Sequence, residues 1–558
     1  MCPSRPSAEP GRALRLLLLV WIVALSALIL GPTLAPGYVL SYDMVWVPDL
    51  SVTRPDLWGL GSGLPRAVPS DALVALLGVI VPQQLLQKAI LLGSLVAAGC
   101  GGARLTRGLG TPAQWAAATV LVWNPFVAER LGIGHWPLLL AYAAVPWLVV
   151  AVRERRFAAG ALLLAVTALT PASGVMGLVV ALVMGRLHDA WRWILLAVAV
   201  NAPWIVASLV SPASLTSDPF GVAVFAARGA GTTPVWLEVA TLGGVWNSDV
   251  RPPSRESVVA TVVAGLVLAL VVFGLVRLWR TGGAGLRPLV ALWGIGFVAA
   301  LAGVVAPSLL AELVGTIPGA GLVRDGSRWV VLMAPATAMG LGAAVAWLTE
   351  RPASTVVGWM VALLVPIAMV PDLGWGLAGR LQAVDYPAEW DHVASALADQ
   401  EGPGDVVSLP FSAFRAPEWN DGRPVLDPAG RYFDRVTVTD DTLRVGAIAI
   451  AGEDPRAARV GLAVEAGDWP YLAAEGIGFL VLDSSAPGPE SVVRRVSALP
   501  LLAHEGDLWL YEVPGDVRDP SGDGRTSAVV VGWSIAGATV LGAAVAQIGR
   551  RRKITRGT

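Results

Sequence analysis

The 558-residue chain is too apolar and too sparsely charged to fold as an ordinary soluble globule. Hydrophobic residues make up 55% of it and charged residues 15%, against roughly 25% charged residues in soluble domains. The net charge of -1 argues against a nucleic-acid-binding protein, which concentrates basic residues on one surface. Two cysteines, Cys2 and Cys100, are too few for a disulfide framework or a cysteine zinc site. The composition therefore predicts a membrane protein.

The near-neutral total conceals two segments of opposite charge. Residues 376–525 contain 25 acidic residues and 12 arginines, which gives -13, and the rest of the chain then contains 16 acidic and 28 basic residues, which gives +12. Such a sharp change in composition predicts that the acidic segment is a separate domain.

Twelve apolar runs approach the length of about 20 residues that a membrane helix needs. The sixth run is short, so that eleven or thirteen spans also fit the sequence. The runs lie near 14–33, 83–103, 112–127, 137–152, 157–172, 174–186, 190–210, 257–276, 288–309, 329–348, 354–372 and 526–548.

Arginines distinguish the two ends of these runs. If the N-terminus is cytoplasmic, the basic residues of the short loops all fall on the cytoplasmic side, as the positive-inside rule requires. The long loops 34–82, 211–256 and 310–328 and the acidic segment then lie outside. We therefore expect a multi-pass protein of the cytoplasmic (inner) membrane with both termini in the cytoplasm. A cleaved signal peptide is the alternative for the first run, but its about 19 apolar residues favour a spanning helix.

The acidic segment has the pattern of a small folded domain. Helical spacing at 387–400, 454–474 and 489–499 alternates with strand-like stretches at 405–410, 435–439 and 476–483, and a hairpin signal follows at 501–513. Alternating helices and strands predict an α/β unit with a partly parallel sheet. The expected division is a transmembrane domain of about 11 helices at 1–375, an extracytoplasmic α/β domain at 376–525, and a final membrane helix with a basic cytoplasmic tail at 526–558.

The first long loop contains candidate catalytic carboxylates. Asp43 follows the first apolar run by about ten residues, in Ser41-Tyr42-Asp43-Met44, where it could serve as a general base at the membrane surface. Asp49 is a second candidate for that role. Both could equally be solvated loop residues, and Asp71 is expected to cap a helix that begins at Ala72.

Two further groups of ionisable residues lie at the expected outer edge. Lys88, at the outer start of the second run, could bind a lipid phosphate or simply extend to the interface. Glu129, Arg130 and His135 form a short polar turn between Trp123 and Trp136. This turn is either part of an interfacial aromatic belt or a carboxylate and an imidazole that face the same pocket as Asp43.

The second and third long loops contain candidates for sugar and phosphate recognition. Trp246 and Asp249 combine a stacking surface with a hydrogen-bonding carboxylate, which suits a sugar, although the same composition suits a loop that lies on the bilayer. Arg324 and Arg328 flank Asp325 in a glycine-rich turn. Arginines in such a turn could hold a phosphate or pyrophosphate, because a guanidinium presents a fork of donors.

Several sequence signals for other chemistries are missing. The four histidines are scattered without metal-ligand spacing, and the sequence contains neither a Walker nucleotide motif nor a G-x-S-x-G elbow. Because the cytoplasmic loops are short, any activated donor is expected to come through the lipid or from outside.

The sequence resembles the GT-C superfamily of polyprenyl-phosphate-sugar glycosyltransferases, with an acid in a long first outer loop, about a dozen spans and an outer domain near the C-terminus. It is more closely similar to actinobacterial membrane proteins related to the arabinofuranosyl- and mannosyltransferases of mycobacterial-type envelopes. The closer similarity rests on Tyr42-Asp43-Met44-Val45, Pro65-Arg66-Ala67-Val68-Pro69-Ser70-Asp71, Trp123 to Arg130, Gly134-His135-Trp136 and Pro318 to Trp329.

This resemblance implies an inverting sugar transfer from a lipid-linked donor to an envelope glycan, glycolipid or protein outside the membrane. Asp43, or alternatively Asp49, would deprotonate the acceptor hydroxyl, and Lys88, Arg324 and Arg328 would bind the donor phosphate. The expected partners are the bilayer, a polyprenyl-phosphate sugar and an envelope acceptor. The first loop has no adjacent pair of acids, so a divalent cation is left open and no metal ligand is assigned.

Two other functions fit the sequence. A non-catalytic envelope-assembly protein would use the acidic domain to bind glycan or partner subunits. A secondary transporter would need ionisable residues or broken helices inside its spans, and Lys88 is the main charged residue inside any expected span.

Overall fold

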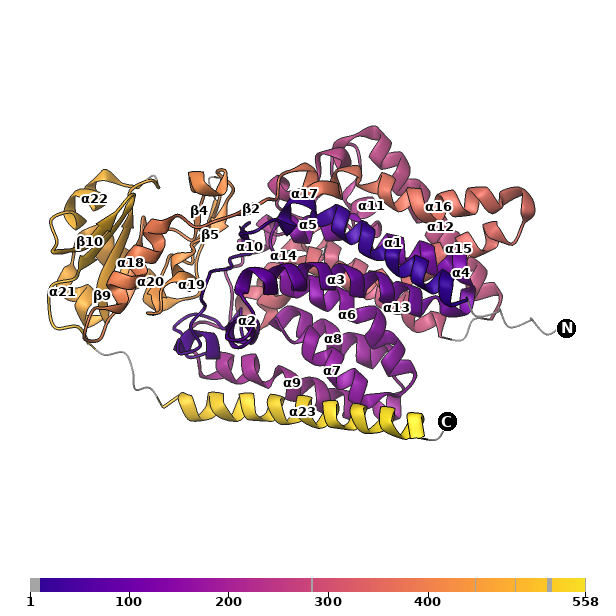
Figure 1. The fold of residues 1–558 in the computed structure, drawn as a ribbon, viewed down its shortest axis with the longest axis horizontal. Helices are drawn as coiled ribbons and strands as arrows, with labels where there is room; N and C mark the ends of the chain where they lie inside the picture. The colour runs from indigo at the N-terminus through magenta and orange to yellow at the C-terminus, as the bar shows by residue number, and fades with distance from the viewer. Residues whose placement is uncertain (1–10, 283–284, 447, 487, 519–523, 557–558) are drawn as a thin grey trace.

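The computed structural model describes residues 11–282, 285–446, 448–486, 488–518 and 524–556, with side chains to residue 550. A bundle of helices forms most of the molecule, and an α/β unit lies beyond one end of the bundle (Figure 1). Helix α1 begins, and helix α23 ends, at the end of the bundle that is farther from the α/β unit. The chain therefore reaches the α/β unit from the helical part and returns along the full length of the bundle.

Nine helices in the described part of the chain are long and apolar enough to cross a membrane. Many of their apolar side chains are exposed on the outside of the bundle, as expected for surfaces that face lipid. The protein is thus a multi-pass membrane protein. The nine are built on α1 (Arg12–Leu30), α3 (Gln83–Leu105), α6 (Trp136–Arg153), α9 (Ala190–Val210), α12 (Val258–Arg280), α13 (Leu286–Val305), α15 (Ala334–Thr349), α16 (Thr355–Met369) and α23 (Thr526–Arg556). Adjoining 3-10 turns lengthen four of them, to Arg12–Leu34, Leu187–Val210, Gly326–Thr349 and Pro352–Met369.

The other three expected spans form shorter apolar helices. They are α4 (Thr111–Val122), α7 (Phe157–Thr167) and α8 (Pro171–Met184), with 12, 11 and 14 residues. Asn124 separates α4 from α5 (Pro125–Gly132) because its side chain accepts the Val127 N–H and caps the next helix. Because these three helices are short, the count of twelve spans remains a prediction.

The α/β unit is built on a five-stranded sheet with the strand order β10-β11-β9-β3-β6. The three strands β9, β3 and β6 are parallel, and β11 and β10 continue the sheet in antiparallel fashion. Each strand lies inside a segment with a strand or hairpin pattern in the sequence. Their bounds are β3 (Asp405–Leu409), β6 (Thr437–Val438), β9 (Ile477–Asp483), β10 (Leu501–Glu505) and β11 (Leu508–Glu512).

The helices of this unit follow their expected positions with one difference. Residues 454–474 form two helices, α20 (Pro455–Ala466) and α21 (Trp469–Ala474), because Gly467 adopts a left-handed conformation with φ of +74° and ends the first. The remaining helices are α18 (Ala388–Ala398) and α22 (Glu490–Val496). Apolar side chains from one face of the sheet and from α20, α21 and α22 form a core of their own, whereas those of α18 and of the other face belong to the cluster shared with the helical part.

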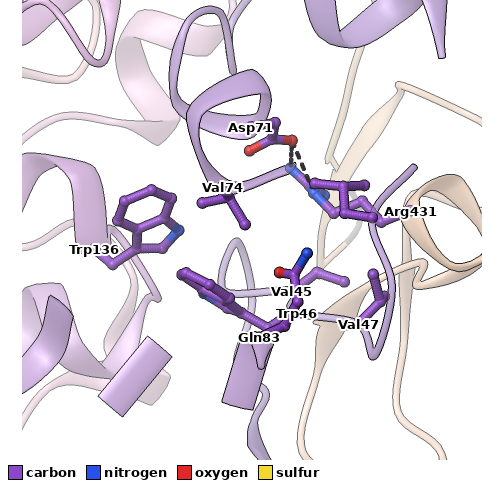
Figure 2. Close-up of a pocket in the computed structure, with 9 residues that line it drawn as sticks. Val45, Trp46, Val47, Asp71, Val74, Gln83, Trp136 and Arg431 are labelled. Atoms are coloured by element: carbon purple, nitrogen blue, oxygen red, sulfur yellow. Dashed lines mark hydrogen bonds and ion pairs between the residues drawn. The ribbon is translucent and has the colours of Figure 1, made fainter. Parts of the chain in front are cut away.

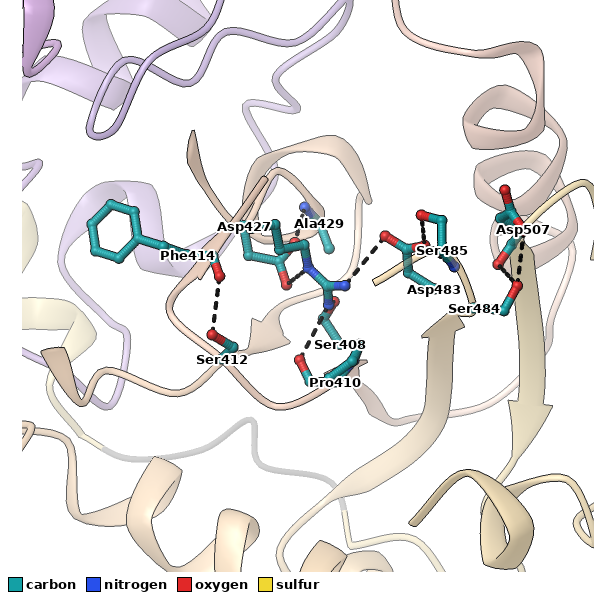
Figure 3. A network of polar contacts seen from close by, with 11 residues as sticks. Ser408, Pro410, Ser412, Phe414, Asp427, Ala429, Asp483, Ser484, Ser485 and Asp507 are labelled. Atoms are coloured by element: carbon teal, nitrogen blue, oxygen red, sulfur yellow. Dashed lines mark hydrogen bonds and ion pairs between the residues drawn. The ribbon is translucent and has the colours of Figure 1, made fainter. Parts of the chain in front are cut away.

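A buried arginine joins a small hairpin to the carboxyl ends of β3 and β9. The hairpin consists of β4 (Phe414–Arg415) and β5 (Val425–Leu426). The Arg415 guanidinium donates to Ser408 Oγ at 2.7 Å and forms ion pairs with Asp427 at 2.9 Å and Asp483 at 3.3 Å (Figure 3). This network fills the edge of the sheet where many α/β proteins bind ligands, and it fixes the hairpin to the sheet.

The opposite edge of the same hairpin contacts the first long loop of the helical part. The Tyr42 N–H donates to Pro424 O at 2.7 Å, and the Leu426 N–H donates to Tyr42 O at 2.8 Å. Nearby, β1 (Tyr38–Val39) pairs with β2 (Ala383–Val384). The α/β unit therefore holds the backbone beside Asp43 in place.

Candidate functional site

A glycine turn brings the Asp43 loop against the start of α6. Gly134 has a φ of +81°, and a Cβ there would lie 2.3 Å from both Met44 N and Ser41 O. The Ser41 hydroxyl donates to Gly132 O at 2.6 Å, and the Asp43 N–H donates to Ile133 O at 3.1 Å. Because glycine alone permits this approach, Asp43 can reach the side chain of the next residue, His135.

Asp43 and His135 form a hydrogen-bonded pair whose proton position follows from its neighbours. His135 Nε2 lies 2.9 Å from Asp43 Oδ2, and Nδ1 lies 3.1 Å from Arg130 Nη1. A guanidinium can only donate hydrogen bonds, so Nδ1 must be the acceptor in that contact. We therefore assign the proton to Nε2, which donates it to the Asp43 carboxylate.

The network continues from Arg130 into the turn that precedes α15. Arg130 Nη2 donates to Ser327 Oγ at 2.7 Å, and that hydroxyl donates to Asp325 Oδ1 at 2.6 Å. Asp325 Oδ2 in turn accepts Arg328 Nε at 2.9 Å. Arg130 is fully buried, so the chain of contacts from Asp43 to Arg328 crosses the interior of the protein.

The surroundings of this pair lower the pKa values of both Asp43 and His135. Burial alone would raise the pKa of Asp43, but the hydrogen bond and charge of His135, together with Arg328 and Arg431, outweigh it and lower that pKa below its ordinary value. Burial, and then Arg328, lowers the pKa of His135. Near neutral pH the pair is therefore an ionised carboxylate beside a neutral imidazole.

Arg324 lies close to two other guanidinium groups. Burial, followed by the charges of Arg66 and Arg328, lowers the pKa of Arg324 to about 10. Its guanidinium lies over the Phe225 ring, 4.7 Å from the centroid, and its Nη1 is 3.6 Å from Glu453 Oε1. Positive charge is therefore concentrated beside the Asp43 network.

The structure places the other candidates of the first loop and of α3 apart from this network. The Asp49 side chain is exposed, and in the described part of the chain no hydrogen bond or ion pair involves it. The Lys88 ammonium donates to Gly37 O at 2.7 Å. Among the described residues no hydrogen bond or ion pair joins Lys88 to Asp43, Arg324 or Arg328.

The expected capping role of Asp71 is wrong. Helix α2 (Ser70–Gly78) begins at Ser70, and no side chain caps it. Asp71 instead forms an ion pair with Arg431 of the α/β unit at 2.8 Å. The carboxylate lies inside the first turn of α2 because that helix begins two residues earlier than expected.

Glu129 points away from Asp43. Its carboxylate accepts the Gly244 N–H at 3.0 Å. Burial, opposed by Arg130 and reinforced by Glu238, raises the pKa of Glu129 to about 7. Its other oxygen, Oε2, is buried and has no hydrogen-bond partner among the described residues. The structure thus joins Arg130 and His135 to Asp43 but places Glu129 in a separate buried site.

Trp246 and Asp249 border the Asp43 loop. The Trp246 ring packs edge-on against Phe225, with centroids 4.9 Å apart. Asp249 Oδ2 accepts the Tyr42 hydroxyl at 3.1 Å. Since Tyr42 precedes Asp43 and has an unusual positive φ of 44°, Asp249 contributes to the conformation of the loop.

A small cavity adjoins the loop on the side of α2. Its volume of about 10 Å³ is near what one water molecule requires. The Gln83 amide and the Trp46 indole N–H are buried without hydrogen-bond partners among the described residues, and Figure 2 shows both beside Trp136 and the Asp71–Arg431 pair.

The surroundings of Asp43 do not fit a divalent cation. Among the described residues, no group of three or more histidine, cysteine or carboxylate side chains is placed to hold a metal ion. Asp43 faces His135, and Asp325 is engaged by Arg328. Because these oxygens have cationic or hydrogen-donating neighbours, no step is assigned to a metal.

Several residues of the site have no role in the sequence-based prediction. Ser327 and Arg66 lie inside motifs that carry the family resemblance, so a site role for them was within reach. Arg431, Glu453 and Ser217, whose hydroxyl donates to Glu453, had no local signal, because each is an ordinary polar residue of a loop or an acidic domain. Only the fold brings them to the site.

Comparison with known proteins supports the fold. No family model and no curated protein matches this sequence. Two solved structures of the arabinofuranosyltransferase AftD from Mycobacteria, the second a mutant, each have a TM-score of 0.57 and 18% identity and cover 93% of this chain. This confirms the GT-C-like fold implied by the sequence resemblance. The chain spans only 41% and 43% of those two chains.

Proposed function

We propose that this protein is a membrane glycosyltransferase that transfers a sugar from a polyprenyl-phosphate donor to a cell-envelope acceptor outside the cytoplasmic membrane. The observation that carries the proposal is the Asp43–His135 pair, with a carboxylate that is 46% exposed beside several arginines. The fold of a mycobacterial arabinofuranosyltransferase supports the same reaction class.

In the proposed reaction, Asp43 is the general base. Its Oδ2 is held by His135, whereas Oδ1 has no hydrogen-bond partner among the described residues and is free to accept the proton of an acceptor hydroxyl. The hydroxyl oxygen then attacks the anomeric carbon from the side opposite the phosphate, which inverts the configuration. A base in hydrogen-bond contact with the attacking group contributes roughly 10²- to 10⁴-fold to the rate.

The leaving phosphate requires positive charge. Arg324 and Arg328 suit this role because both lie near the Asp43 network and a guanidinium matches phosphate geometry. Lys88, which donates to Gly37 O, would be better placed to hold the loop that leads to Asp43. We therefore assign the donor phosphate to the two arginines.

Replacing Asp43 tests the proposal. Asp43→Asn should reduce transfer from a polyprenyl-phosphate sugar by at least about 10²-fold, because an amide cannot accept the proton. The assay is transfer by the purified protein in proteoliposomes, together with the pool of lipid-linked sugar in cells. Asp49→Asn is the matched control, since it removes a charge from the same loop where no contact is recorded, and it should leave transfer unchanged.

Other results would favour the other functions. Full transfer by Asp43→Asn would remove Asp43 as the base. A wild-type protein that binds envelope glycan but consumes no lipid donor would indicate an assembly protein instead. Flux of a substrate across proteoliposomes without glycosyl transfer would indicate a transporter.

A further inference from the structure

One carboxylate of the α/β unit inserts among three polar side chains of the helical part. Glu453, between β8 (Ile448–Ile450) and α20, forms an ion pair with Arg66 through Oε2. Its Oε1 accepts the Ser217 hydroxyl at 2.6 Å and lies 3.6 Å from Arg324 Nη1. Arg66, Ser217 and Arg324 come from three different long loops, all of which are expected to lie outside the membrane.

Glu453 is buried, but the group that surrounds it is accessible from one side. The Glu453 side chain is 5% exposed and that of Arg324 is 15% exposed, whereas the Arg66 side chain is 60% exposed. In the part of the chain that the structure describes, Glu453 is the one carboxylate within ion-pair distance of either guanidinium. Without it, two arginines and a hydroxyl would face a site open to solvent at Arg66.

These three side chains are the donors that a phosphate group requires. Arginine forks bind carboxylates and phosphates with the same geometry, and a serine hydroxyl donates to either. Arg328 adds further positive charge, because it and Arg66 both act on Arg324. A phosphate with two negative charges would therefore gain more from this group than a single carboxylate does.

We propose that Arg66, Ser217 and Arg324 form a phosphate-binding site and that Glu453 occupies it until a phosphate group displaces this carboxylate. The inference rests on the proposed function and deepens it, since the phosphate would be that of the polyprenyl monophosphate released when the sugar is transferred. The Glu453 carboxylate then competes with the phosphate for the same three donors. Its withdrawal opens the phosphate site, and its return closes it.

The loop that holds Glu453 is fixed from both sides: Asp218 and Ser62 of the helical part bond to Ala451 and Asp454, and a side chain of the α/β unit holds it from within. Asp441 Oδ2 accepts the N–H groups of Glu453 and Asp454 at 2.7 and 2.8 Å. A Cβ on Gly452 would lie 1.7 Å from Asp441 Oδ1, so that glycine permits the tight contact. Because Asp441 fixes the loop from its own side, withdrawal of the Glu453 side chain need not unfold the loop.

Phosphate binding by the full-length protein tests this assignment without relying on transfer. Glu453→Gln keeps the shape of the side chain and removes its charge, so the affinity for polyprenyl monophosphate in neutral-lipid nanodiscs, and for inorganic phosphate, should rise roughly tenfold. This is the expected size when one competing charge-assisted hydrogen bond is lost. Glu490→Gln is the control, because Glu490 is an exposed carboxylate of α22 that pairs only with Arg494 in the described chain.

The outcomes separate the two proposals. If the double variant Glu453→Gln/Arg66→Gln no longer binds phosphate more tightly than the wild-type protein, the site is supported. Unchanged or weaker phosphate binding by a folded Glu453→Gln protein would overturn it. A gain for polyprenyl monophosphate assigns the site to the lipid headgroup, and a gain for inorganic phosphate alone assigns it to a free anion. Tighter phosphate binding in a protein that transfers no sugar would retain the site and reject the glycosyltransferase.

Discussion

At the residue scale, the geometry of His135 suits a group that orients Asp43, the base of the proposed reaction, and not a base in its own right. Its Nδ1 accepts from Arg130 and its Nε2–H donates to Asp43, so the neutral ring has no free lone pair for an acceptor proton. Burial, then the charge of Arg328 and to a smaller extent that of Arg130, lower the pKa of His135 and disfavour a second proton on the ring. The imidazole is therefore a positioning group with one fixed tautomer.

This role predicts a shift in the pH profile. The hydrogen bond and charge of His135 are the largest influences that lower the pKa of Asp43, so His135→Leu should raise this pKa and move the acid limb of kcat/KM to higher pH. His135→Gln, whose amide can still donate, should restore part of the original profile. The measurement is kcat/KM between pH 4 and pH 8, and a lower rate with an unchanged profile would contradict the positioning role.

Individual residues were the least predictable part of the site. Asp43, Arg130, His135, Arg324 and Arg328 stand out because a charged residue beside an apolar run is uncommon. Glu453 does not, since it is one of 25 acidic residues in the segment 376–525. Its partners are more than 100 positions away in the chain, and no local pattern encodes such a contact.

At the scale of elements, the short turn between α5 and α6 sets the distance between Asp43 and His135. Gly134→Ala should destabilise the protein by about 2–4 kcal/mol, because the left-handed backbone and the clash with main-chain atoms both add cost. The same change should reduce transfer activity, since the Asp43 loop must move away from His135. Thermal unfolding in detergent and the transfer assay measure the two effects.

A second glycine, Gly379, provides a control that separates the cost of backbone strain from the cost of the steric clash at Gly134. Gly379 has a φ of +84°, but no atom lies within 4 Å of the position its Cβ would occupy. Gly379→Ala should therefore lose only the part of the stability that belongs to backbone strain and should keep its activity. Equal losses in the two variants would show that the approach of Met44 to Gly134 does not matter.

The elements were predictable where the signal is local. Apolar runs located the long helices because a membrane helix satisfies its own backbone hydrogen bonds, and strand patterns located β3 and β9. The hairpin of β4 and β5 was missed because each strand has only two residues. Its position depends on Arg415, which contacts not only the nearby Ser408 and Asp427 but also Asp483, 68 residues away, and no local window includes that contact.

At the scale of the whole molecule, the fold places the two chain ends on one side and the α/β unit on the other (Figure 1). The distribution of arginines predicts that the side with the chain ends is cytoplasmic. In a variant with Cys2 and Cys100 replaced by serine, a membrane-impermeant maleimide should label Glu490→Cys in intact cells. Gly108→Cys, in a short basic loop, should be labelled only after the membrane is opened, and the reverse pattern would invert the topology.

The backbone pairing of Tyr42 with Pro424 and Leu426 has a consequence for biosynthesis. Asp43 emerges from the ribosome early, whereas the strand that holds its loop is translated almost 400 residues later. If Asp43 is the base of the proposed reaction, a nascent chain that has inserted the helices before residue 376 therefore still lacks the strand that orders it. Folding of the late α/β segment would then complete the site, and we expect unfinished chains in the membrane to be inactive toward a lipid-linked donor.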